Sequence, residues 1–193
     1  LSSDTTGQIG PYLPIGNKNF DPEYDRELYF LVDSDFTITN LIPIGLDSPF
    51  RWHFDGGNHT ITVEQQSEYY GMAGLFASIE GATISNITVS YNNVSTEDAF
   101  YWGGIAGYAE NSIISNCKVM GSIENHFYPE SDGFFGGIVA NASETMLYNC
   151  VNMAELYLYS GQVGITTGGI VGYGDSITMR SCVNFGYIHG YPD

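Results

Sequence analysis

The chain has 193 residues, enough for one domain, and 43% of them are apolar and 15% aromatic, which is sufficient for a continuous core. It carries 22 acidic and five basic residues, a formal net charge of −17 at pH 7, so we expect it to bind neither nucleic acid nor anionic lipid, which both require clustered cations. Since no apolar run approaches the roughly 20 residues of a membrane-spanning helix, we also expect no membrane insertion.

The first part of the chain predicts a cap followed by short strands. Residues 1–28 are punctuated by Pro and Gly, and we expect them to form an N-terminal cap over the strand edges of residues 29–193. The aromatic and β-branched content of residues 28–32 and the alternation of residues 36–39 predict the first two strands. Asp-Gly-Gly-Asn at 55–58 predicts a turn before a strand in which Ile61 and Val63 point inward.

A repeated segment organises the rest of the chain. Each copy begins with a lead glycine in a Gly-rich strand and reaches an Asn or Ser 12 residues later. The lead glycines are Gly74, Gly104, Gly137 and Gly169, and the second positions are Asn86, Asn116, Asn149 and Ser181. Successive lead glycines are 30, 33 and 32 residues apart. A fixed segment joined by variable connections at such a period indicates a solenoid.

The repeat predicts an all-β fold, a parallel β-helix of about five to six coils in a single domain. Each period of about 30 residues divides into three short strands, which is typical of one coil, and coils are spaced by about 4.8 Å.

Stacked coils place equivalent side chains above one another. Asn tolerates a left-handed bend, and the amides of Asn86, Asn116 and Asn149 are expected to hydrogen-bond one another in a ladder. Three cysteines share one repeat position: Cys117, Cys150 and Cys182. We expect them to form a buried column of small side chains and to make neither a disulfide framework nor a metal site, because the sequence has no CxxC and no histidine at ligand spacing.

The repeats resemble the GLUG-motif repeats of bacterial surface and secreted proteins. They are also similar to the β-helical repeat region that precedes the catalytic part of bacterial immunoglobulin A1 protease metallopeptidases. The segments that carry the resemblance are Gly-Leu-Phe at 74–76, Gly-Ile-Ala-Gly-Tyr at 104–108 with Ile-Ser-Asn-Cys at 114–117, Gly-Ile-Val-Gly-Tyr at 169–173 with Ser-Cys-Val-Asn at 181–184, and Phe-Asp-Gly-Gly-Asn-His-Thr-Ile at 54–61. The resemblance implies a right-handed β-helix in an exported bacterial protein, secreted or on the cell surface, and it implies no shared ligand. The zinc motif His-Glu-x-x-His of the peptidases is absent from the sequence, so proteolysis is not implied.

No residue pattern predicts catalysis. Asp33, Asp35 and Asp55 are the best candidates for the paired carboxylates of a polysaccharide hydrolase, but turn chemistry explains each of them. The five basic residues are scattered, which disfavours a lyase. We therefore expect no enzymatic activity and no cofactor.

Two functions remain open. The first is a non-catalytic stalk, scaffold or adhesin-like module of a larger surface protein, with a host or bacterial surface protein or glycan as its partner. The second is a carbohydrate-binding or polysaccharide-degrading module, for which Trp102 and Phe135, at one repeat position, are the candidate ligand-stacking residues. The alternative for this pair is a packing ladder between coils. No charged or Pro-rich cap follows the last copy, from which we expect a downstream domain or end-to-end self-association.

Overall fold

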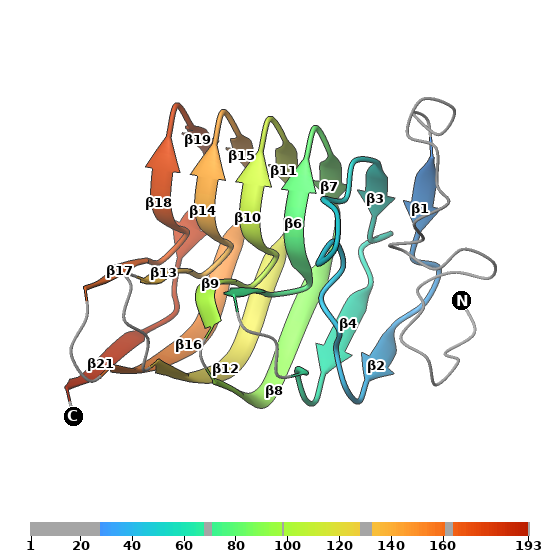
Figure 1. Ribbon diagram of the computed structural model, residues 1–193. Coiled ribbons are helices and arrows are strands. Elements are labelled where there is room, and N and C mark those ends of the chain that lie inside the picture. Colours follow the sequence, from blue (N-terminus) through green and yellow to red (C-terminus); the bar gives the residue numbers. More distant parts are fainter. Residues whose placement is uncertain (1–27, 68–70, 98, 128–132, 161–163, 193) are drawn as a thin grey trace.

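The computed structural model describes residues 28–67, 71–97, 99–127, 133–160 and 164–192. All the regular secondary structure in these ranges is β-strand, and the strands stack in parallel layers as a β-solenoid of about four turns (Figure 1). The expected fold class is thereby confirmed. The expected cap at 1–28 lies outside the described residues except for Leu28.

Four parallel sheets form the walls of the solenoid. Sheet I contains β1 (Tyr29–Leu31), β3 (His53–Asp55), β7 (Thr83–Ser85), β11 (Ile113–Ser115), β15 (Met146–Tyr148) and β19 (Thr178–Arg180). Sheet II contains β2 (Phe36–Ile38), β4 (Thr60–Val63), β8 (Thr88–Glu97), β12 (Lys118–Phe127), β16 (Val151–Ser160) and β20 (Val183–Asn184), and β21 (Ile188–Pro192) also pairs with β16. Sheet III contains β5 (Gly71–Ala73), β9 (Ala99–Gly103), β13 (Gly133–Gly136) and β17 (Ile165–Gly168). Sheet IV contains β6 (Phe76–Glu80), β10 (Ala106–Glu110), β14 (Val139–Ser143) and β18 (Val171–Asp175).

A complete turn passes through sheets III, IV, I and II, and therefore has four strands where the sequence predicted three. Sheet I has six strands and sheet II has seven, which form six layers because β20 and β21 both pair with β16, whereas sheets III and IV have four strands each. The expected five or six coils thus describe only two of the walls. The additional strand lies in sheet III, directly before each lead glycine, where the repeat pattern predicts a variable connection.

The long strands of sheet II are the second departure from the prediction. β8, β12 and β16 have 10 residues each, whereas the sequence predicted short strands. Buried and outward side chains alternate along β12, with Ile123 and Asn125 buried and Glu124 exposed. Tyr157 and Tyr159 lie in β16.

The core is a set of columns that run across the layers. Ile84, Ile114 and Leu147 are register partners in sheet I and are fully buried. Burying one such side chain contributes roughly 1.5–3 kcal/mol. Ile61 and Val63 also point inward and have no exposed area, as predicted.

The repeat has one part of constant length and one variable corner. From the lead glycine to the end of the long strand each turn has 24 residues, at 74–97, 104–127 and 137–160. Measured between strand ends, the differences in period lie at the corner between sheets II and III, while in the paired register β8 also has one residue more than β12.

Candidate functional site

The lead glycines lie at the bend between sheets III and IV, not inside a strand as the sequence suggested. At Gly104 an added Cβ would approach Val119 Cγ1 to 2.5 Å and the carbonyl oxygen of Gly137 to 2.6 Å. Such contacts are closer than packed atoms tolerate, so a side chain at this bend would push the layers apart. The carbonyl of Gly104 accepts a hydrogen bond from the buried Tyr91 hydroxyl at 2.8 Å.

The expected asparagine ladder is present. Asn86, Asn116 and Asn149 all have left-handed φ values, of 55°, 53° and 52°. Asn116 Nδ2 donates to Asn86 Oδ1 at 3.0 Å, and Asn149 Nδ2 donates to Asn116 Oδ1 at 3.1 Å. Asp55 begins the ladder, since its Oδ1 accepts from Asn86 Nδ2 at 3.0 Å. Ser181 keeps the left-handed φ, at 55°, but its side chain is too short to continue the ladder.

The cysteines form the expected column, with one difference. The Sγ atoms of Cys117, Cys150 and Cys182 contact the carbonyl oxygens of Ile84, Ile114 and Leu147 at 3.7, 3.5 and 3.5 Å. Cys117 and Cys150 are buried, and burial raises the pKa of the Cys117 thiol well above its usual value. The expectation that all three are buried is wrong for Cys182, which is partly exposed because it belongs to the last described layer.

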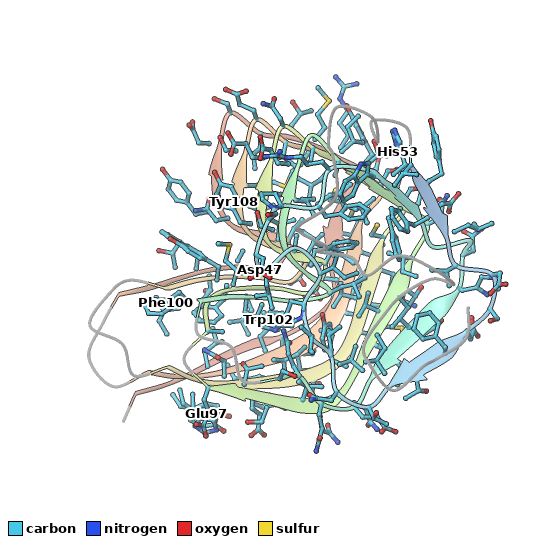
Figure 2. The ribbon with its side chains drawn as sticks, turned by 45° about the vertical axis from the view of Figure 1, so that its right-hand side comes forward. Asp47, His53, Glu97, Phe100, Trp102 and Tyr108 are labelled. Carbon is cyan, nitrogen blue, oxygen red and sulfur yellow. The ribbon has the colours of Figure 1, made fainter. Side chains whose placement is uncertain are left out.

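Trp102 and Phe135 are register partners in β9 and β13, as their shared repeat position predicted. Their exposed fractions are 1% and 0%, so neither ring lies at the outer face, and the stacking of a ligand on them is excluded. Trp102 points into the interior (Figure 2), where Tyr91 packs edge-on against it with the ring centroids 5.3 Å apart. The packing-ladder interpretation of this pair is the correct one.

Two rows of aromatic side chains lie on the outer face of sheet II, and the sequence did not reveal them. One row joins His126, Tyr159 and Tyr191, with ring centroids 4.6 and 4.9 Å apart. The other joins Tyr157 and His189, whose centroids are 4.6 Å apart. The planes within these rows differ by 6°, 12° and 7°, so the rings cover one another's faces and turn their edges outward. The rows therefore stabilise the stacking of layers.

The candidate acids serve turns in the first layers. Asp55 Oδ1 accepts from the Gly57 backbone N–H at 2.9 Å in addition to Asn86. Asp35 Oδ1 accepts from the Thr60 N–H at 2.9 Å and from His59 Nδ1 at 3.1 Å. These hydrogen bonds lower the pKa of the Asp35 carboxyl group, and the bond from the Thr60 N–H has the largest effect. Asp33 accepts from the neighbouring Ser34 hydroxyl at 3.2 Å.

Two further findings concern metal binding and membrane-spanning helices. In the described ranges no group of three or more His, Cys, Asp and Glu is placed to hold a metal ion. None of the described elements is a helix that could span a membrane.

The stacked layers, the bend glycines and the asparagine ladder define a parallel β-solenoid repeat module. The family model described as the GLUG motif matches residues 98–124, which extend from the start of β9 into β12. The resemblance to GLUG-motif repeats is therefore supported, while the similarity to the immunoglobulin A1 protease region stays a prediction. No curated protein matches the chain, and no solved structure matches it.

Proposed function

We propose that the chain is a non-catalytic structural module, a stalk or scaffold with an adhesin-like role in a secreted or cell-surface bacterial protein. The observation that carries the proposal is how the repeated polar residues are used. The amides of Asn86, Asn116 and Asn149 bond one another from layer to layer, and the thiols of the cysteine column bond to core carbonyls. The repeat therefore specifies a rigid body, in which these amides and the two buried thiols are engaged in contacts between layers.

The module acts without catalysis. Two of the three candidate acids, Asp35 and Asp55, already accept two hydrogen bonds each from turn residues. A hydrolase needs one carboxyl group protonated to act as an acid, whereas the hydrogen bonds at Asp35 favour its ionised form.

Export and surface location form part of the same proposal and follow from the GLUG resemblance. The strongly negative charge suits a soluble exposed module, whose partner is a surface protein or glycan.

The test is an activity screen combined with localisation. The purified chain is incubated with peptides and with plant, bacterial and host polysaccharides, next to Asp35→Asn and Asp55→Asn, with the exposed Asp47→Asn as the matched control. We expect no turnover by any of these proteins, and surface labelling by antibody on intact cells of the source bacterium. Turnover that Asp35→Asn or Asp55→Asn abolishes and Asp47→Asn retains would overturn the non-catalytic role. Detection only inside lysed cells would overturn the surface role.

A further inference from the structure

In sheet II, β8 pairs with the preceding strand β4 over only the first part of its length. β4 and β8 pair from Thr60 opposite Thr88 to Val63 opposite Tyr91. Beyond Val63 the chain leaves β8 and pairs with the segment that follows β2, where Gln66 forms a parallel bridge with Leu41. β8 remains paired with β12 on its other side up to Glu97 opposite His126, so its second half has a neighbouring strand on that side and is not paired with β4. Between the two diverging segments lies a hollow of about 630 Å³.

A β-bulge shapes one wall of this hollow. Tyr91 is opposite Gly121 but Val94 is opposite Ile123, so β8 has one more residue than β12 at this point. Asn93 lies in the bulge with a left-handed φ of 53° and accepts a hydrogen bond from the Ser122 hydroxyl. Bulges redirect side chains and are over-represented beside binding sites.

All the described lining residues have polar side chains. Eight described residues line the hollow, and they comprise four amides, two hydroxyls and two carboxylates. Asn93, Ser95 and Glu97 come from β8, and Glu64 faces them from the segment after β4. Glu97 lies on the outer face near the end of the strand (Figure 2). None of these eight residues is Lys, Arg or His.

Gln66 is the one lining residue that is buried, with an exposed fraction of 7%. Its Nε2 is 3.5 Å from the carbonyl oxygen of Gly74. Its Oε1 has no hydrogen-bond partner in the described part of the chain. Leaving a buried acceptor unpaired costs about 1–3 kcal/mol; because Oε1 has less than 1 Å² of exposed area, a ligand in the hollow can donate to it only if the Gln66 side chain rotates.

From this geometry we infer that the hollow binds a neutral sugar. Amide and carboxylate groups are the partners that adjacent sugar hydroxyls need, because each hydroxyl both donates and accepts. The two carboxylates disfavour acidic sugars and phosphates. The volume lies in the range of roughly 300–1,000 Å³ typical of small-molecule sites, whereas a lone calcium ion is held by oxygens at about 2.3–2.6 Å and needs no such space.

The pattern of lining residues also favours a sugar over an added peptide strand. Only the outward-facing residues of β8 line the hollow, whereas the intervening Val94 and Thr96 are buried and do not line it. Strand addition would instead use the backbone edge. His126, opposite Glu97 in the next layer, does not line the hollow, and its ring stacks on Tyr159.

The experiment measures binding of neutral glucan, mannan, galactan and xylan oligosaccharides on an array and then by calorimetry. Glu64→Gln and Glu97→Gln each remove an ionised acceptor without changing shape, and we expect either to weaken binding about tenfold or more. Glu144→Gln, the same change at the exposed bend between β14 and β15, serves as the control and should bind as the wild type does. Circular dichroism verifies that all three variants are folded.

Three outcomes would overturn the inference: no binding of any neutral oligosaccharide at millimolar concentration, equal binding by the wild type and both pocket variants, or saturable heat from calcium chloride alone that both pocket variants abolish. The inference goes beyond the structural role proposed above and does not depend on it. Failure of sugar binding would leave the scaffold role standing, and catalytic turnover would leave the pocket binding measurable.

Discussion

The asparagine ladder provides the sharpest quantitative prediction. Asn116 is its central member, because it donates to Asn86 and accepts from Asn149. Substitution Asn116→Ala removes both hydrogen bonds and places a non-glycine residue without a polar side chain at a φ of 53°. Asn111 occupies a bend with a φ of 49° and makes no side-chain hydrogen bond within the described residues. Asn111→Ala is therefore a control for the backbone alone.

The expected cost has two parts. A net hydrogen bond contributes about 0.5–1.5 kcal/mol, and the ladder is solvent-exposed, so its two bonds contribute about 1–2 kcal/mol together. The left-handed backbone costs an ordinary residue about 1–2 kcal/mol, part of which Asn already bears. We expect Asn116→Ala to lower the free energy of unfolding by about 2–3 kcal/mol, and Asn111→Ala by about 1 kcal/mol.

Urea unfolding followed by far-ultraviolet circular dichroism measures both variants. Asn116→Gly adds a third point, since glycine tolerates the left-handed backbone but cannot form the ladder. It should be less damaging than Asn116→Ala. If Asn111→Ala proves as costly as Asn116→Ala, the amide ladder contributes nothing to stability and the reasoning about this column is wrong.

Three further predictions concern single residues. Cys182 should react with a thiol reagent in the native protein, whereas the two buried cysteines should react only on unfolding; equal labelling of all three would contradict the column. Because the folded pKa of Asp35 lies below its unfolded value of about 3.9, its stabilisation is present above that pH and is lost as the pH falls through the folded pKa. Asp35→Asn should therefore unfold with a weaker acid dependence than the wild type, and identical acid titrations of stability would refute this. Gly104→Ala should cost about 1–3 kcal/mol by overpacking, while Gly190→Ala, where an added Cβ meets nothing within 4 Å, should be nearly neutral in thermal melts.

The sequence predicts the features that repeat. Gly104 and Asn116, 12 residues apart, each lie at a bend in the structure. One strand of sheet IV and one strand of sheet I lie between the two bends. The spacing is visible in the sequence because both bends need special backbone geometry. Periodic restraints of this kind are visible without coordinates. The asparagine and cysteine columns follow directly from them.

The sequence could not predict the features that depend on strand parity or on a break in the repeat. In β9 the partly exposed Phe100 and Tyr101 are consecutive, so alternation does not reveal that Trp102 points inward. The hollow beside Asn93 arises where two strands stop pairing and one gains a residue. Neither event recurs at the same repeat position in the described turns, so neither leaves a periodic signal.

The constant 24-residue part of each turn and the single variable corner have a practical consequence for protein engineering. Within the constant part a one-residue insertion would exchange the inward and outward faces of a strand and disrupt every column that crosses it, unless a bulge absorbs it as at Asn93 in β8. At the corner between sheets II and III, successive turns already differ by up to three residues without a shift in the paired layers. Peptide epitopes or affinity tags can therefore be grafted at this corner, one in each turn and aligned along one edge of the solenoid.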